Sequence, residues 1–213
     1  MTKGGFLQKN WCQTDAERAR RSLAAWYDDH ARDLPWRLTP SLYGTWLSEI
    51  MLQQTRVDTC IPKWHLFHEL FPAVEDLAQA SAAAVMKAWE GLGYYRRARL
   101  LHQAAKVVAS QGGFPENREG WLALPGVGPY TSAAIASIGL GEAVAAVDGN
   151  VQRVMSRWAG VTDAVDSKPG AKAIQGVADA WLDAARPGDH NQAVMDWALC
   201  CARPSSRAVP NAL

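Results

Sequence analysis

Apolar and polar residues follow one another along this chain with the period of an α-helix. Between residues 43 and 51 apolar side chains recur at i, i+3, i+4, i+7 and i+8, which form one face of a helix. Similar patterns, with their start and stop signals, predict further helices at about 14–34, 62–72, 81–91, 96–110, 117–123, 130–140, 149–159, 168–184 and 190–201. No stretch alternates Val, Ile or Thr for long enough to indicate a strand. The pattern therefore predicts an all-α protein.

Local signals place several helix ends. Thr14 with Glu17 is typical of a capping box, and Ser81 of an N-cap. Pro62 is expected in the first turn of its helix, where its missing amide costs nothing. Gly112, followed by a second glycine, should end the helix that begins near Arg96.

Size and composition indicate a folded chain. It has 213 residues, 48% of them hydrophobic and 20% charged, which suits one large domain or two small interlocking ones. No apolar run approaches the roughly 20 residues of a membrane-spanning helix, and the first 17 residues lack the apolar core of a secretory signal. We therefore expect no membrane association and a cytoplasmic, nucleoid-associated location.

Charge and cysteine content are less informative. The net charge is +1, but the segment from Lys87 to Arg118 contains six basic residues and two acidic ones. Such an excess of positive charge is also typical of a solvated helix face. The four cysteines, at positions 12, 60, 200 and 201, have no metal-site spacing. Reduced thiols and no bound metal are the expectation.

A glycine-rich turn lies between the expected helices at 117–123 and 130–140. Gly126 and Gly128 allow a tight turn and a close approach of the backbone to a partner. Their amides, beside the start of the next helix, could bind an anion such as a phosphate. An ordinary interhelical turn would look similar, but the whole segment 124–135 resembles the helix–hairpin–helix of DNA-binding proteins.

The second candidate is Asp148, in the segment Val147-Asp-Gly-Asn-Val151. On its own it is typical of an N-cap residue. Its position about 20 residues after the hairpin resembles the helix–hairpin–helix superfamily of base-excision DNA glycosylases, in which this aspartate supports loss of the base.

Four further segments, 34–37, 46–55, 91–99 and 191–196, resemble the MutY-type adenine DNA glycosylases, and the resemblance covers about residues 15 to 200. It implies a helix–hairpin–helix glycosylase fold, with two helical subdomains and the active-site cleft between them. One subdomain would span about 30–140, with the hairpin motif at 117–140, and the other 1–29 plus 141–201. Residues 202–213 are expected to be a disordered tail, and no residues remain for the family's C-terminal domain, which recognises 8-oxoguanine.

The resemblance also assigns roles to single residues. Glu49 would be the general acid; it lies roughly 130° from the apolar stripe, where a solvated glutamate would also fit. The other catalytic positions would be Asp148, Tyr130 and Asn150. Residues that would enclose the adenine are Trp36, Arg37, Leu52 and Asp196. DNA-binding positions would be Gln54, Thr55, Leu92, Tyr94, Arg96, Gly126, Gly128 and Thr131. Among them Gln54 and Tyr94 match the family's wedge, the side chains that fill the gap left in the duplex when the base is extruded.

The expected function is therefore hydrolysis of the N-glycosidic bond of adenine paired with 8-oxoguanine or guanine in double-stranded DNA, by a monomer. A glycosylase/lyase of the endonuclease III type would need a lysine where this chain has Tyr130. A thymine or uracil mismatch glycosylase of the same superfamily, and an inactive truncated DNA-binding homologue, remain alternatives.

One feature of the family is missing from this sequence. MutY-type enzymes usually hold a [4Fe–4S] cluster with cysteines spaced C-x6-C-x2-C-x5-C. Cys201 could be a relic of the first ligand, but the other three are absent and no histidine replaces them. We therefore expect that this chain binds no cluster.

Overall fold

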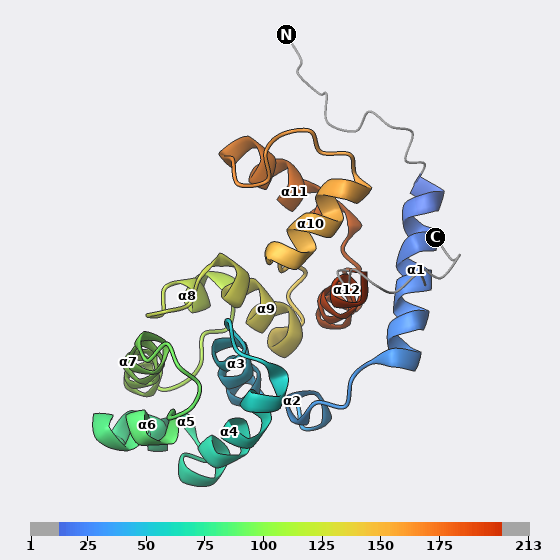
Figure 1. Cartoon of the computed structure of the whole chain (residues 1–213). Coiled ribbons are helices and arrows are strands. Elements are labelled where there is room, and N and C mark those ends of the chain that lie inside the picture. The colour runs from blue at the N-terminus through green and yellow to red at the C-terminus, as the bar shows by residue number, and fades with distance from the viewer. Residues whose placement is uncertain (1–12, 202–213) are drawn as a thin grey trace. The chain divides into compact units, whose positions relative to one another are not determined.

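The computed structural model describes residues 13–201, and the prediction of an all-α protein is confirmed for them, since they form helices and no strand (Figure 1). Contacts divide the chain into two compact units. We call residues 32–142 the continuous unit, and the described parts of 1–31 and 143–213 the composite unit. Each is described by itself.

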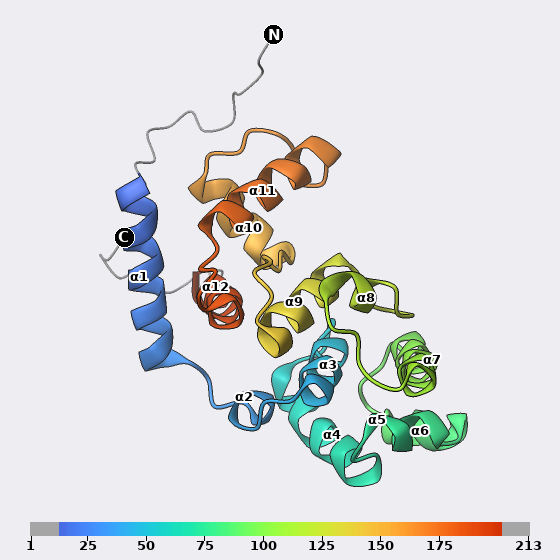
Figure 2. The same ribbon diagram turned by 180° about the vertical axis from the view of Figure 1, so that it is seen from behind.

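The continuous unit is built around a core rich in tryptophan. Its helices are α2 (Pro35–Leu38), α3 (Leu42–Met51), α4 (Val57–Leu70), α5 (Val74–Gln79), α6 (Ala82–Ala88), α7 (Arg96–Gln111), α8 (Arg118–Leu122) and α9 (Pro129–Leu140). Helix α3 packs against α4 and α9, and α7 packs against α5 and α6 (Figures 1 and 2). The rings of Trp46 and Trp121 are fully buried and meet edge to face, with centroids 5.7 Å apart. This core fixes the backbone from which α3 and the α8–α9 hairpin project their side chains.

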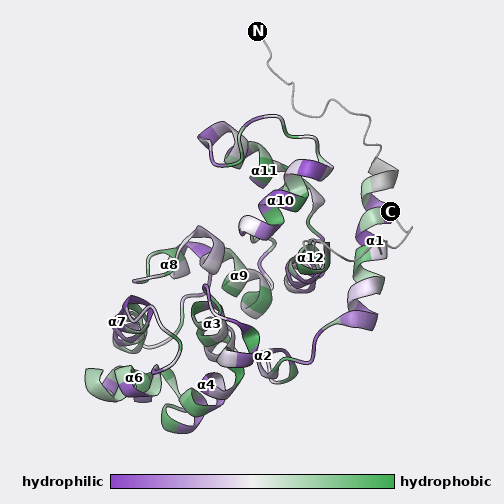
Figure 3. Cartoon of the chain, viewed as in Figure 1, coloured by the Kyte–Doolittle hydropathy of each residue, from purple (hydrophilic) through white to green (hydrophobic). Residues whose placement is uncertain are grey.

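The composite unit has a smaller core. Its helices are α1 (Gln13–His30), α10 (Gly149–Trp158), α11 (Lys168–Trp181) and α12 (Pro187–Cys201). Helix α12 packs against both α1 and α10. The ribbon of α10 carries both hydrophobic and hydrophilic residues (Figure 3), and its apolar side buries Val151 and Met155 in a cluster with Ile174. Burial of this one face is what joins the amphipathic helices of the unit.

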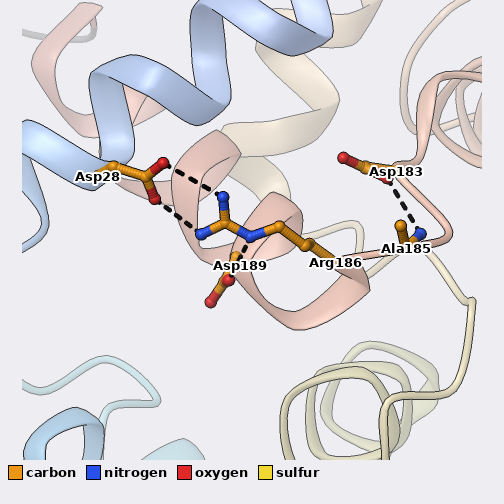
Figure 4. Close-up of polar contacts among 5 residues, drawn as sticks. All are labelled: Asp28, Asp183, Ala185, Arg186 and Asp189. Carbon is orange, nitrogen blue, oxygen red and sulfur yellow. Dashed lines mark hydrogen bonds and ion pairs between the residues drawn. The ribbon is translucent and has the colours of Figure 1, made fainter.

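Polar contacts and a buried histidine mark the packing of α1 on α12. Arg186 binds both carboxylate oxygens of Asp28, at 2.7 and 3.2 Å, and one oxygen of Asp189 at 2.9 Å (Figure 4). These ion pairs are about half exposed, so each contributes little to stability. Nearby, His190 is buried against the ring of Trp181, and burial lowers its pKa to about 4.

Two of the predicted helix starts were wrong. Helix α1 begins at Gln13, so Thr14 lies within it and is not its N-cap. Helix α4 begins at Val57, which places Pro62 inside the helix instead of in its first turn. A proline there removes one backbone hydrogen bond, and the burial of Cys60, Trp64 and Phe67 around it keeps the helix packed.

Other local signals were read correctly. Ser81 accepts the amide of Ala84 at the start of α6, and Gly112 ends α7 in the left-handed conformation. Within residues 13–201 no helix is long and apolar enough to cross a membrane. Cys12 and the expected tail at 202–213 lie outside the described residues.

Candidate functional site

The α8–α9 hairpin owes its shape to buried anchors and one required glycine. Asn117 caps α8 by accepting the amide of Gly120 at 2.9 Å, and Leu124 and Val127, within the turn, are buried. Gly126 has φ +78°, and a Cβ there would lie 2.7 Å from the Cβ of Leu100. Only glycine fits this position, because both the backbone conformation and the space exclude a side chain.

The start of α9 is open. Gly128 is its N-cap, Pro129 follows, and no side chain caps the helix. A Cβ on Gly128 would meet nothing within 4 Å, so the space beside this helix end is free of protein atoms at that range. The unsatisfied amides of a helix N-terminus carry positive partial charge, which makes this end suited to an anion.

The two candidate wedge segments, 50–55 with Gln54 and 92–94 with Tyr94, lie in the same unit as the hairpin. Thr131, buried in the first turn of α9, accepts a hydrogen bond from the Gln53 side chain at 3.4 Å. The next residue, Gln54, is exposed and has φ +57°; Tyr94 is 62% exposed and has φ +45°. The backbone thus presents both side chains to solvent in a conformation that few non-glycine residues adopt.

Helix α3 carries Glu49 within a well-buried setting. The predicted apolar stripe, from Tyr43 to Met51, is buried, and Glu49 is only half-buried. Gly44, Thr45 and Ser48 are buried as well, which the helical pattern did not predict. The reason is tertiary: α3 is enclosed by α4 on one side and α9 on another. Glu49 is therefore more exposed than its neighbours Ser48 and Ile50 on this largely enclosed helix.

In the composite unit, Asp148 caps α10. One carboxylate oxygen accepts the amides of Asn150 and Val151 at 2.9 and 2.7 Å, and the other accepts the Asn150 side chain at 3.0 Å. Arg153 in turn donates to the side-chain oxygen of Asn150. The carboxylate is thereby held in one orientation by three N–H groups.

The segment leading to Asp148 is tied to α12. The buried side chain of Asn191 donates to the carbonyl of Val144 at 2.9 Å and accepts the amide of Ala146 at 3.0 Å. Asn191 opens the segment 191–196 that resembled the family, and it thus acts as a backbone clamp. The pattern alone did not indicate this role, because a side-chain amide reveals its partners only in the folded chain.

The remaining predicted positions fall in both units. Trp36 is buried on α2 and packs against Trp64, with ring centroids 6.2 Å apart, while Arg37 and Leu52 are half-buried. Leu92 is buried in the segment before Tyr94, and Arg96 is exposed at the start of α7. Asp196 is buried on α12. Thus Asp148, Asn150 and Asp196 belong to the composite unit, and the other predicted site residues belong to the continuous unit.

Sequence reasoning missed Arg97. It was counted only as one of several positive charges, yet it is buried and binds the backbone of both candidate wedge segments. Its place between Arg96 and Ala98 in the sequence gave no signal of this burial.

The described residues do not fit an iron–sulfur cluster. They contain no group of three or more His, Cys, Asp or Glu side chains placed to hold a metal ion. The Cys60 thiol is buried, donates to the carbonyl of Met51, and has its pKa raised by burial to about 11. Cys200 is exposed near the end of α12, and Cys201 is its last residue. That the chain binds no cluster stays a prediction.

Comparison with known proteins identifies the family. Residues 47–178 match the model of the HhH-GPD superfamily of base excision DNA repair proteins. The chain belongs to this superfamily. It is 45% identical to the adenine DNA glycosylase of Homo sapiens over 83% of its own length and 37% identical to that of Arabidopsis thaliana over 97%. These matches confirm the resemblance to adenine DNA glycosylases, and they cover 34% and 38% of the relatives, so the chain spans little more than a third of their length.

Solved structures support the fold. A thermostable thymine-DNA glycosylase aligns with a TM-score of 0.81 and 28% identity, covering 89% of each chain. A trapped endonuclease III–DNA covalent intermediate aligns with a TM-score of 0.76 over 92% of this chain and 91% of that one. Identity in the second case is 16%, so it supports the fold alone. The predicted helix–hairpin–helix glycosylase fold is confirmed.

Proposed function

We propose that this protein is a monofunctional adenine DNA glycosylase, which hydrolyses the N-glycosidic bond of adenine opposite 8-oxoguanine or guanine in double-stranded DNA. The observation that carries the proposal is Glu49, on a segment of α3 within the region that is 45% identical to a curated adenine DNA glycosylase. We expect the protein to act as a monomer.

DNA would be held by its backbone at the hairpin. The open N-terminus of α9 offers amides and a partial positive charge where a phosphate could bind. Such contacts fix the register of the protein on the duplex and read no sequence. Arg96 and Thr55 would add contacts beside the hairpin, in the same unit.

Adenine inside a duplex hides its glycosidic bond, so the base must leave the stack at a cost of a few kcal/mol. Gln54 and Tyr94 would fill the gap, since both are exposed and project from adjacent loops of the continuous unit. Trp36, Arg37, Leu52 and Asp196 would enclose the extruded base. Loss of stacking in the duplex is thus offset by contacts to the protein.

Bond cleavage would use two carboxyl groups. Glu49 would give a proton to N7 of the adenine, because a neutral purine leaves more easily than an anion. Departure of the base leaves positive charge on the sugar, and the Asp148 carboxylate would stabilise it, with Asn150 and Tyr130 as orienting groups. The division of labour parallels the two carboxyl groups of sugar hydrolases. Three N–H groups already fix the orientation of Asp148, which suits a stabilising role.

Two related activities are the rivals. A lyase reaction needs an amine to form a Schiff base, and the phenol of Tyr130, two residues after Gly128, cannot supply one. Removal of mismatched thymine is favoured by one observation, the 28% identity to a thymine-DNA glycosylase. The third alternative is a homologue that binds DNA but cleaves no glycosidic bond.

The test is single-turnover release of base from duplexes that hold A opposite 8-oxoguanine, A opposite G, A opposite C, or T opposite G. We expect adenine release opposite 8-oxoguanine and G, with a modest preference for the lesion, and strands that break only after alkali. Glu49→Gln should lower the rate by about 10³-fold and preserve DNA binding. Glu69→Gln, an exposed glutamate on α4, is the matched control and should keep the wild-type rate.

Release of thymine in place of adenine would support a thymine mismatch glycosylase. Strand cleavage at neutral pH that borohydride traps would support the lyase. Binding to all four duplexes with no base released would leave only the DNA-binding homologue.

A further inference from the structure

Arg97 is a buried arginine whose partners are all neutral oxygens. It lies in the first turn of α7 and is 9% exposed. Its Nη1 donates to the carbonyls of Ile50, Met51 and Gln53, at 3.0, 2.9 and 2.5 Å. Its Nη2 donates to Thr55 Oγ1 at 2.9 Å and to the carbonyls of Leu92 and Gly93 at 2.9 and 3.3 Å. One guanidinium therefore joins the segment 50–55 to the segment 92–93.

Gln54 and Tyr94 adjoin these acceptors, and they have an unusual backbone. They are the non-glycine residues with positive φ in the part of the chain that the structure describes. Holding an ordinary residue in this region costs on the order of 1 kcal/mol or more, and it persists only where the surroundings enforce it. Both strained residues are also exposed, so their side chains gain little from packing in return.

The bonds of Arg97 supply that enforcement. Gln54 lies between Gln53 and Thr55, which both accept from the guanidinium. Tyr94 directly follows Gly93, whose carbonyl accepts from the guanidinium. The carbonyl of Tyr94 accepts the backbone amide of Arg97 at 2.9 Å, and the ring centroid of Tyr94 lies 5.5 Å from the Arg97 Cζ. Both strained turns are thus bracketed by hydrogen bonds to one residue.

The chemistry of the group explains why it is arginine. Burial lowers the pKa of Arg97, yet a guanidinium stays charged in proteins and offers donors in a fixed planar fork. A lysine would bring one compact ammonium with three donors, which could not reach six acceptors on two segments. The Cζ of Arg97 also lies 5.2 Å from the centroid of the buried Trp89 ring, a favourable cation–π contact.

We propose that Arg97 is a positioning residue for base extrusion: its guanidinium holds Gln54 and Tyr94 as one rigid pair that enters the base stack. The inference rests on the proposed function and adds to it the element that sets the geometry of both wedge residues. Two wedge side chains on independently mobile loops would lose conformational entropy on entering DNA, and the shared guanidinium lowers that cost before DNA binds.

The experiment uses duplexes with 2-aminopurine at the adenine position, since its fluorescence rises when it leaves the stack. Arg97→Lys should lower extrusion and single-turnover adenine release by about tenfold or more, while affinity for undamaged duplex changes less than twofold. Arg99→Lys is the matched control, an exposed arginine on the same helix, and should behave as wild type. Circular dichroism checks that each variant is folded.

Coupling separates positioning from a general loss of stability. In a background of Gln54→Ala with Tyr94→Ala, Arg97→Lys should lower extrusion by less than twofold, because nothing remains for it to position. An equal loss in both backgrounds would overturn the inference. Should Arg97→Lys not fold, Thr55→Val removes one acceptor of Nη2, and the same coupling criterion applies to it.

Different results would overturn the proposed function and the role of Arg97. Wild-type protein that neither extrudes 2-aminopurine nor releases adenine overturns the proposed function and this inference with it. Active wild-type protein with an Arg97→Lys variant within twofold of it overturns the role of Arg97 alone.

Discussion

Two helix N-termini in this protein are built in opposite ways. Helix α10, in the composite unit, begins with Asp148, whose carboxylate occupies the first free amides at 2.7 and 2.9 Å. Helix α9, in the continuous unit, begins with Gly128 and Pro129, has no side-chain cap, and leaves open space beside its first turn.

The difference shows how one physical property can serve two purposes. Every helix N-terminus has unpaired amides and a partial positive charge that favours an anion. At α10 the protein supplies the anion itself, so the amides fix the orientation of a carboxylate. At α9 no anion is supplied, so the amides remain suited to one from outside, such as a phosphate. Substitutions at the two ends should therefore have different consequences.

The largest effect is expected at Asp148. Asp148→Asn should lower single-turnover adenine release by at least about 100-fold, because the charge that would stabilise the sugar cation is lost. Stability should change by less than about 1 kcal/mol, since Asn is also a good N-cap. Release is measured together with urea unfolding.

Ser167→Ala is the matched control for capping, because Ser167 caps α11 in the same unit through the amide of Gly170. It should lose about 1 kcal/mol of stability and no activity per folded molecule. If Asp148→Asn behaved in this way too, capping would be the whole role of Asp148.

The second effect concerns the turn that presents α9. Gly126→Ala should lower the free energy of unfolding by about 2 kcal/mol, because the new Cβ meets Leu100 and the residue is left-handed. Gly128→Ala should change it by less than about 1 kcal/mol, since φ is −95° and the space is open. Equal losses in urea titrations would contradict the different roles assigned to the two glycines.

The third effect would make α9 resemble α10. Gly128→Asp should weaken binding to duplex DNA by about tenfold, because its carboxylate would compete with a phosphate for the helix amides. Gly128→Asn has nearly the same shape without the charge and should lose less than threefold. Fluorescence anisotropy at fixed, low salt measures both, and matching losses would argue against a phosphate at this helix end.

The smallest effect concerns how the stability of the protein depends on pH. The pKa of His190 is lowered to about 4 by burial, so between about pH 6.5 and pH 4 the unfolded chain binds a proton that the folded chain does not. Stability should therefore fall as the pH drops, by less than about 1 kcal/mol between pH 7 and pH 6. His190→Gln should weaken this dependence, measured by urea unfolding at several pH values. The half-buried His68 and the buried His102, whose pKa values are also lowered, account for part of what remains.

The sequence predicted most helices because helix formation follows local rules. Apolar spacing located α3, and Ser81 and Gly112 located helix ends, since each depends on residues a few positions apart. Pro62 was misplaced because proline is usually found in a first turn, and here the packing of α4 outweighs that preference. The short helix α5 was missed, because six residues are too few for a periodic pattern to be recognised.

The candidate site divides in the same way. The motifs in the sequence by themselves singled out the residues proposed to carry the chemistry, Glu49, Asp148 and the glycines of the hairpin, because their resemblance to a family lies in short contiguous segments. The sequence also determined the all-α class. Tertiary structure alone decided that Arg97 is buried and that its charge faces carbonyls from positions 44 to 47 residues earlier in the chain. It likewise decided that the Asn191 side chain binds the backbone of Val144 and Ala146, just before Asp148, which lie 47 and 45 residues before Asn191 in the sequence. The reason is that a hydrogen bond across such a separation forms only once the core has brought the two segments together, and no local pattern records it.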